Sequence, residues 1–299
     1  MKLRELANEY LASYNFTNLH KNTQNHYKVC MGYIFNTELD GIDLLGNQEV
    51  NNITVGIARD VYESWCSGGR ISFANHNVAV LNILFNYGLY HELCKINPLS
   101  VLRKRTVQPR KVVWCREDVL KFLTAAYGDF STRNVGLIAH MAYEWCQRVG
   151  DMRMLKWDQV DLEKRRVTIL QSKRQAQVEL PIEDDLCSML TQQAQDWDFQ
   201  DYVAPNPIPK DNTYIPYDKY QLPNIAKHIR IQAGLSKELR LSDLRRTGIV
   251  EMVDAEVGTF QIMSVSGHKN PQSVKPYLKN TYASANNALS ARYKDRDNT

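Results

Sequence analysis

A basic stretch without acidic residues separates two parts of the chain. No Asp or Glu occurs from Arg103 to Arg116. Five cations lie on either side of Pro109: Arg103, Lys104, Arg105, Arg110 and Lys111. The stretch has no apolar periodicity, so no helix or strand with a buried face is expected there. On charge alone it is either a solvated linker or a segment that contacts nucleic acid. We place a domain boundary here.

Helical apolar spacing dominates the residues before this stretch. Residues 3–15, 23–36 and 55–66 place apolar side chains three and four residues apart, as on one face of a helix. A fourth helix is predicted from a cap at Ser72 to about Tyr87, and a short one over residues 90–95. Residues 40–53, with several Gly and Asn, are predicted to be a loop. The pattern predicts a helical domain over residues 1–104 and a linker over 105–114.

The second part mixes helices with one pair of strands. Residues 166–170 and 177–182 are β-type runs on either side of a turn, as in a β-hairpin. Helices are predicted over residues 116–127, 134–147, 184–194, 219–233, 242–254 and 259–265, with another after Thr281. The predicted fold is therefore mainly α with a small antiparallel sheet (α+β), and the second domain spans residues 115–299.

Composition excludes several classes of protein. Of the 299 residues, 43% are hydrophobic, which argues against a disordered or collagen-like chain. No apolar run approaches the roughly 18 residues of a membrane span, so no membrane partner is expected. Six scattered cysteines form no CxxC pair, so free thiols in a reducing compartment are expected. Phosphate-binding and metal-binding motifs such as GxxxxGK[ST] and HExxH are missing, so neither a cofactor nor a metal is expected.

Two segments of the second part carry charged side chains that could belong either to a functional site or to the solvated surface. Arg148 follows a mostly apolar helix, with Asp151 three residues later. Such an arginine is either a solvated helix end or a buried group with a partner. Lys173 and Arg174 lie at the tip of the predicted hairpin, where ordinary turn chemistry is the simple alternative.

Two further segments lie near the C-terminus. Ser242 is placed to cap a helix that carries Arg245 and Arg246 in its first turns. Two cations there oppose the helix dipole, which suggests an anion that the helix end and both guanidinium groups share. His268 follows Gly267, and Tyr277 lies nine residues further on. By itself, such a tyrosine is more often a packed surface residue.

Taken in order, the four segments resemble the tyrosine recombinase (phage integrase) family. The family has an Arg-x-x-Glu/Asp stretch before a Leu-x-Trp-x-Asp pattern, a hairpin lysine, a His-x-x-Arg element, and a Gly-His element before the nucleophile. Its catalytic positions fall on Arg148, Asp151, Lys173, Ser242, Arg245, His268 and Tyr277. The resemblance covers essentially the whole chain, most specifically residues 144–180 and 239–282. It departs at Ser242, where the family usually has His and sometimes Lys.

The resemblance implies a site-specific DNA recombinase that cleaves and rejoins strands through a 3′-phosphotyrosyl intermediate, without ATP or metal. Tyr277 would attack the phosphate, while two arginines and a histidine stabilise the charge on its non-bridging oxygens. Lys173 would protonate the leaving 5′ oxygen, and Asp151 would orient a cation. Serine is a poor base, so water or His268 would take the proton of Tyr277. A type IB topoisomerase-like nicking–closing enzyme and a catalytically impaired DNA-binding relative remain alternatives.

The resemblance also implies partners. These are double-stranded DNA attachment or recombination sites held in a C-shaped clamp of the two domains, accessory DNA-bending proteins, and further copies that form a homotetramer through the C-terminal helix. A phage or mobile-element origin would place the protein in a bacterial cytoplasm or nucleoid. The cations expected to contact DNA are Arg103, Lys104, Arg105, Arg110, Lys111, Arg174, Arg246 and Lys269.

Overall fold

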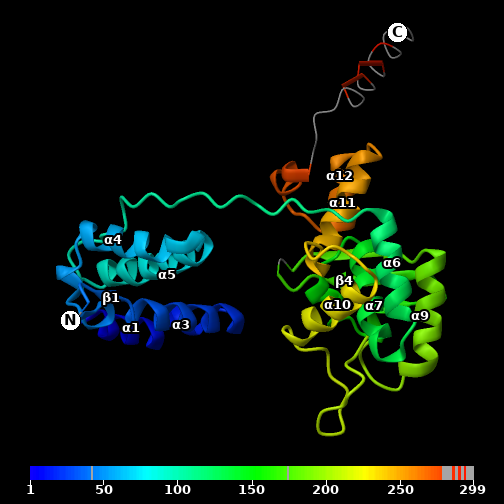
Figure 1. The fold of residues 1–299 in the computed structure, drawn as a ribbon, viewed down its shortest axis with the longest axis horizontal. Helices are drawn as coiled ribbons and strands as arrows, with labels where there is room; N and C mark the ends of the chain where they lie inside the picture. The colour runs from blue at the N-terminus through cyan, green and yellow to red at the C-terminus, as the bar shows by residue number, and fades with distance from the viewer. Residues whose placement is uncertain (42, 174, 278–284, 287–288, 291–292, 294–299) are drawn as a thin grey trace. The chain divides into compact units, whose positions relative to one another are not determined.

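The chain divides into two compact units, Met1–Arg110 and Lys111–Thr299 (Figure 1). The computed structural model describes residues 1–41, 43–173, 175–277, 285–286, 289–290 and 293. Residues 102–115 form neither helix nor strand. Among the described residues, no helix is long and apolar enough to cross a membrane. The helix predicted after Thr281 falls for the most part outside the described residues.

Apolar faces of helices form the core of the first unit. Its helices are α1 (Leu3–Ala12), α2 (Tyr14–Thr17), α3 (Lys21–Phe35), α4 (Val55–Cys66) and α5 (Ile71–Tyr90). Helix α4 has the predicted bounds, and α3 begins two residues before the predicted start. Ser13, in an extended conformation, divides the predicted helix 3–15 into α1 and α2.

Three predictions for the first unit are wrong. The predicted loop 40–53 contains β2 (Asp43–Leu44), which is antiparallel to β1 (Glu38–Leu39) just before the loop, and two 3-10 turns, whose side chains Leu45 and Val50 are buried in the core. Helix α5 begins at Ile71, so Ser72 lies inside it rather than capping it. No separate helix forms over residues 90–95, because α5 continues to Tyr90, Glu92 adopts a left-handed conformation and the chain turns back, with Leu93 N donating to Gly88 O at 2.7 Å.

The second unit packs helices around a three-stranded antiparallel sheet. The sheet order is β3-β4-β5, from β3 (Val160–Asp161), β4 (Arg166–Leu170) and β5 (Gln177–Pro181). The hairpin of β4 and β5 is confirmed, and its buried face includes Ile169 opposite Val178. Strand β3 was not predicted, because two residues are too few to show an alternation of apolar and polar side chains. The helices are α6 (Arg116–Tyr127), α7 (Phe130–Glu144), α8 (Val149–Met152), α9 (Asp184–Trp197), α10 (Gln221–Gln232), α11 (Leu244–Asp254) and α12 (Thr259–Ser266).

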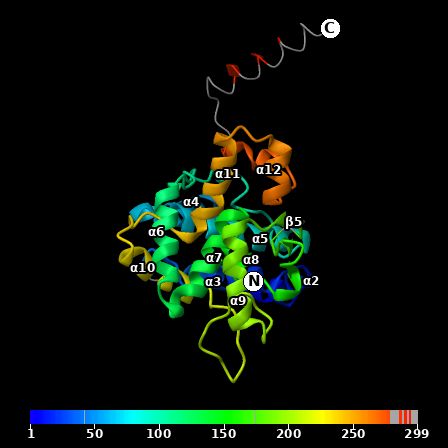
Figure 2. The ribbon, with the colours of Figure 1, turned by 90° about the vertical axis from the view of Figure 1, so that its right-hand side faces the viewer.

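Helix α7 is the central helix of this unit. It contacts α6, α8, α9, α10 and α11, and Figure 2 shows α6, α7 and α9 side by side. Helix α11 approaches closely because Gly248 has no side chain: a Cβ there would lie 2.8 Å from the carbonyl oxygen of Tyr143. The close approach brings the first turn of α11 to the segment that follows α7. The predicted mainly α fold with a small antiparallel sheet is confirmed.

A buried histidine in α7 makes the stability of the second unit depend on pH. Burial lowers the pKa of His140 to about 4, and its Nδ1 lies 2.9 Å from the Tyr127 hydroxyl. An unfolded histidine has a pKa of about 6.5, so between these values the unfolded chain binds a proton that the folded chain does not. The stability that His140 contributes is therefore present above about pH 6.5 and falls by up to about 3 kcal/mol as the pH approaches about 4.

The variant His140→Gln is expected to remove this loss, because glutamine does not titrate. Urea unfolding of the variant and the wild type at about pH 7 and about pH 4 measures the difference. His228→Gln, on the exposed side of α10, is the matched control and should keep the wild-type pH dependence. An unchanged pH dependence in His140→Gln would contradict the assignment.

Candidate active site

Arg148 lies just after a sharp turn at the end of α7. Cys146 adopts a left-handed conformation with φ of 50°, and Arg148 is the residue before α8. Its side chain is 25% exposed, and Nη1 donates to Oε1 of Gln171 at 3.0 Å. The same nitrogen lies 3.6 Å from Oδ2 of Asp151. The interpretation of Arg148 as a solvated helix end is therefore wrong: it is a largely buried cation with partners.

Asp151 joins Arg148 to the hairpin of β4 and β5. Its carboxylate is buried, and Oδ1 accepts from both the backbone nitrogen (3.1 Å) and the hydroxyl (2.6 Å) of Ser172. Lys173, the next residue, is exposed at the hairpin tip. Two hydrogen bonds from Ser172 thus occupy Oδ1 of Asp151. They fix the backbone of the hairpin at the residue directly before Lys173.

Arg245 is a buried cation with an unsatisfied nitrogen. Nη2 donates to the carbonyl oxygen of Ser266 at 2.8 Å and lies 3.3 Å from Nε2 of His268. Nη1 is buried and has no hydrogen-bond partner among the described residues. Burial, and next the charge of Arg148, lower the pKa of Arg245 to about 10, so it stays charged at neutral pH. A buried guanidinium with an unused N–H is suited to an anion that arrives from outside.

Hydrogen bonds around Ser266 define the tautomer of His268. The Ser266 hydroxyl donates to the carbonyl oxygen of Ile262 at 2.6 Å, one helical turn back. Its oxygen therefore accepts from Nδ1 of His268, which lies 2.7 Å away. In a neutral ring Nδ1 then carries the proton and Nε2 carries the lone pair. Nε2 is on the side of the ring that faces Arg245.

Tyr277 lies against this group in the 3-10 turn Lys275–Tyr277. Its ring is 6.1 Å from the ring of His268, centroid to centroid, and the guanidinium carbon of Arg246 is 4.7 Å from its centroid. It packs on a small apolar cluster that includes Cys146 and Val274. The structure thus brings five predicted catalytic residues together: Arg148, Asp151, Arg245, His268 and Tyr277.

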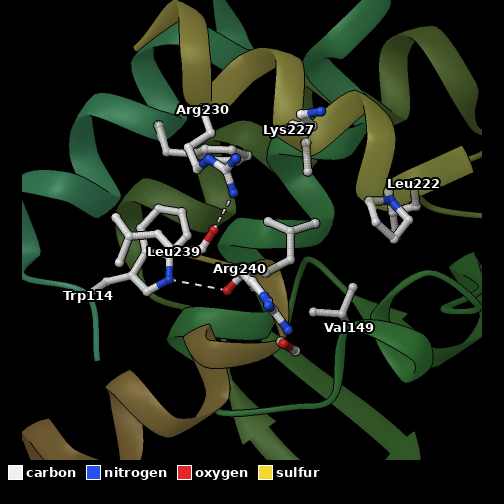
Figure 3. A pocket seen from close by; sticks show the side chains of 12 residues that line it. Trp114, Val149, Leu222, Lys227, Arg230, Leu239 and Arg240 are labelled. Carbon is white, nitrogen blue, oxygen red and sulfur yellow. Dashed lines mark hydrogen bonds between the residues drawn. The ribbon is translucent and has the colours of Figure 1, made fainter. Parts of the chain in front are cut away.

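Ser242 lies at the edge of this arrangement rather than in it. Its side chain is exposed, and it does not cap α11, whose N-cap residue is Asp243 without a side-chain cap hydrogen bond. The carboxylate of Asp243 instead accepts from Arg240 N at 3.0 Å, at the start of the preceding 3-10 turn Leu241–Asp243. Ser242 lines a mostly apolar pocket of about 270 Å³ beside Trp114 and Val149 (Figure 3). Figure 3 also shows the hydrogen bond from the Trp114 indole to the Arg240 carbonyl oxygen, which is 3.2 Å long.

The cations predicted to contact DNA differ in their surroundings. Arg105 is tied to the first unit: its side chain pairs with Glu63, and its backbone nitrogen donates to the Tyr62 hydroxyl at 2.6 Å. Arg110 is half-buried, and Arg246 lies over the ring of Tyr277. Arg174 lies outside the described residues. Four others are exposed: Arg103, Lys104, Lys111 and Lys269.

Sequence reasoning missed three buried polar residues that join the site. Gln147, Gln171 and Ser266 are each 0% exposed and hydrogen-bond to one another or to the charged residues. The signal available in the sequence was their position: Gln147 directly precedes Arg148, and Gln171 lies two residues before Lys173. Both are polar residues beside apolar runs, where a buried side chain needs partners.

Comparison with known proteins decides the class of this chain. Residues 114–284, more than half of the sequence, match the phage integrase family. The chain belongs to the phage integrase family. The resemblance seen in the sequence is therefore confirmed, and the chain is a tyrosine recombinase by family. Curated proteins give no match.

Solved structures of integrases share the fold of this family member. A lambda integrase(75-356) dimer bound to a COC′ core site is 17% identical, covers 93% of this chain and 96% of that one, and has a TM-score of 0.77. The Tn1549 transposon integrase in complex with transposon right end DNA is 14% identical, with coverages of 98% and 100% and a TM-score of 0.79. A lambda integrase tetramer bound to a Holliday junction is 17% identical, with coverages of 93% and 78% and a TM-score of 0.75.

Proposed function

We propose that this chain is a site-specific recombinase that cleaves and rejoins DNA through a 3′-phosphotyrosyl link to Tyr277. One observation carries the proposal: Arg245 keeps a buried, unpartnered Nη1 beside Arg148, His268 and Tyr277. Asp151 is one carboxylate beside two cations at low exposure, and the excess positive charge costs folding free energy unless a further anion joins it. A DNA phosphate supplies that anion, and a phosphodiester is the substrate that a nearby tyrosine can attack.

The chemical step builds negative charge on the phosphate. The Tyr277 oxygen forms a bond to phosphorus, and the bond from phosphorus to the 5′ oxygen breaks. Arg148 and Arg245 donate to the non-bridging oxygens, where pre-oriented donors stabilise the transition state most strongly. The tyrosyl phosphodiester conserves the bond energy, so an incoming 5′ hydroxyl reseals the strand without ATP or a metal ion.

Two protons move in this scheme. We propose that Nε2 of His268 accepts the Tyr277 proton, because Nδ1 donates to Ser266. Nε2 lies 3.3 Å from Nη2 of Arg245, and it becomes available when the DNA phosphate takes the Arg245 donors. The imidazolium that results becomes a further donor to the phosphate. Lys173 gives a proton to the departing 5′ oxygen. Exposed Ser242, in the position where the family usually has histidine, is given no part in proton transfer.

A covalent-capture experiment tests the function with DNA of random sequence. The protein is incubated with a pool of nicked duplexes that carry a randomised stretch, in EDTA and without ATP, and adducts that resist SDS are sequenced. The proposal predicts adducts enriched in one sequence. Adducts without sequence preference, together with relaxation of any supercoiled plasmid, would indicate a type IB topoisomerase-like enzyme. Specific binding without an adduct would indicate an impaired DNA-binding relative.

Lys173→Ala is expected to slow cleavage of ordinary DNA by about 10²–10⁴-fold, because the 5′ oxygen loses its acid. A substrate with sulfur in place of the bridging 5′ oxygen needs no proton, since a thiolate leaves unaided. The variant should therefore cleave that substrate at close to the wild-type rate in single-turnover assays. A variant that is equally slow on both substrates would show that Lys173 is not the acid.

We also propose that the reaction takes place in a homotetramer on two DNA sites, in the cytoplasm or nucleoid of a bacterial host. A helix in the C-terminal residues would dock on a neighbouring copy, and accessory DNA-bending proteins would help to bring the sites together. Deletion of residues 283–299 tests the docking. The shortened protein should still cleave its site but fail to form a synaptic complex on native gels. A wild-type yield of synaptic complex would contradict this part of the proposal.

A further inference from the structure

The side chain of Gln171 is buried, and each of its polar atoms is used. Oε1 accepts from Nη1 of Arg148 at 3.0 Å. Nε2 donates to Oε1 of Gln147 at 2.6 Å and to the carbonyl oxygen of Ser266 at 2.8 Å. An amide has two N–H groups and a carbonyl oxygen, so this one is fully satisfied. A buried amide with this set of partners fixes the position of each of them.

Gln171 and these partners come from three separate parts of the second unit. Gln171 directly follows β4 and begins the turn that carries Lys173, and its backbone nitrogen donates to Ala176 O at 2.9 Å. Arg148 follows α7, and Ser266 ends α12 and holds the His268 ring. One side chain therefore joins the hairpin to both of the other parts of the site.

The contact with the α12 end is close enough to dictate a neighbouring residue. Gly267 has a φ of 68°, and a Cβ there would lie 2.4 Å from Nε2 of Gln171. Glycine is therefore required at this point both for the backbone conformation and for the approach of the amide. Ser266 O receives a second hydrogen bond, from Nη2 of Arg245 at 2.8 Å. Through that oxygen the amide reaches the second arginine as well.

Gln171 binds Arg148 without neutralising it. An amide oxygen satisfies one N–H of the guanidinium and adds no charge, whereas a carboxylate would cancel the charge that a phosphate needs. Asp151 forms a long ion pair with Arg148, at 3.6 Å, and gives its other oxygen to Ser172. Two arginines therefore lie beside one carboxylate, and because Gln171 adds no second negative charge, a net positive charge stays available to an incoming anion.

We propose that Gln171 is a positioning residue that couples the Lys173 hairpin to both arginines while leaving their positive charge for the DNA phosphate. The inference rests on the proposed function, since it assigns a role within the same site. Gln171 does not touch the reacting atoms and acts only through Lys173, Arg148 and Ser266. Two properties of the amide carry the role: its hydrogen-bond geometry and its lack of charge.

Two variants separate these properties. Gln171→Met keeps the approximate volume and loses the hydrogen bonds, whereas Gln171→Glu keeps an acceptor for Arg148 and adds a negative charge. Gln175→Glu is the matched control, because it adds the same charge at an exposed position of the same hairpin tip. Each protein is assayed for DNA affinity, thermal stability, and single-turnover cleavage of both the ordinary and the 5′-thio substrate.

Gln171→Met is expected to cleave ordinary DNA at least about tenfold more slowly and to regain most of that loss on the 5′-thio substrate, which needs no acid. DNA affinity should change by less than about threefold, because the variant keeps every cation and adds no charge. A general loss of structure would slow both substrates equally. A defect of equal size on both substrates, or no defect, would overturn the coupling to Lys173.

Gln171→Glu is expected to slow both substrates by about 10²-fold, because its carboxylate neutralises Arg148. If Gln171→Met fails to fold, Gln171→Glu still tests the proposed role of Gln171. Wild-type rates in Gln171→Glu, or an equal loss in Gln175→Glu, would overturn the charge argument. If the proposed recombinase function itself is wrong, the wild type forms no adduct on either substrate. This result differs from every result that would overturn the role of Gln171.

Discussion

Tyr277→Phe is expected to lower the yield of covalent protein–DNA adduct by about 10³-fold or more while DNA affinity stays within about threefold of the wild type. The substitution removes one oxygen atom, the proposed nucleophile. The phenyl ring keeps its packing beside Cys146 and Val274 and its place under the Arg246 guanidinium. The measurement is gel analysis of SDS-resistant adducts on the captured DNA sequence, beside a binding titration.

A second tyrosine variant controls for the loss of a hydroxyl. Tyr220 is 71% exposed in the same unit, and Tyr220→Phe should form adduct at the wild-type yield. Adduct at the wild-type yield in Tyr277→Phe would show that another group attacks the phosphate. Loss of DNA binding together with adduct would show that Tyr277 is needed for the fold and not for the chemical step.

Arg245→Met is expected to slow cleavage by about 10²–10³-fold without lowering the thermal stability of the DNA-free protein. Burial and the neighbouring Arg148 lower the pKa of Arg245 to about 10, below the value of an unfolded arginine. Keeping this group charged therefore costs folding free energy at every pH below about 10, and methionine removes that cost. The Ser266 carbonyl oxygen keeps its hydrogen bond from Gln171.

Arg133, another buried arginine of the same unit, forms an ion pair, so its loss is expected to lower stability. Arg133 donates to Asp196 at 2.7 Å, and its guanidinium carbon lies 4.6 Å from the ring centroid of Phe130. Arg133→Met should lower the melting temperature and leave single-turnover cleavage unchanged. Single-turnover rates and melting curves of both variants are compared. A fall in stability in Arg245→Met as large as that in Arg133→Met would show that Arg245 serves the fold.

Periodicity predicted the elements that have long amphipathic faces. Helices α4 and α6 have the predicted bounds, and the hairpin of β4 and β5 follows from β-type runs on either side of a turn. Shorter elements were missed, because two-residue strands such as β3 contain no period to read. The end of α7 was placed too late, since Trp145 and Cys146 continue the apolar run although Cys146 turns the chain.

The site was predictable where order and spacing along the chain carry the signal. The nine residues from His268 to Tyr277 and the position of Arg148 identified residues that the structure brings together. The network around Gln171 was not predictable, because its partners are 23 to 95 residues away in the sequence. Spacing predicts Ser242 as the cap of α11, but a 3-10 turn precedes the helix and the N-cap position falls on Asp243, whose carboxylate accepts from Arg240 at the start of that turn. A choice between neighbouring polar residues at a helix start depends on geometry that spacing does not contain.

Peptide mapping of the adduct tests the central claim most directly. Trypsin separates Tyr277, between Lys269 and Lys279, from Tyr282, which lies between Lys279 and Arg292. Captured adduct is digested with nuclease and trypsin, and the peptide that carries the nucleotide is identified by mass spectrometry. We predict a nucleotide 3′-phosphate on Tyr277. A nucleotide on Tyr282 or on any other residue would contradict the assignment of the nucleophile.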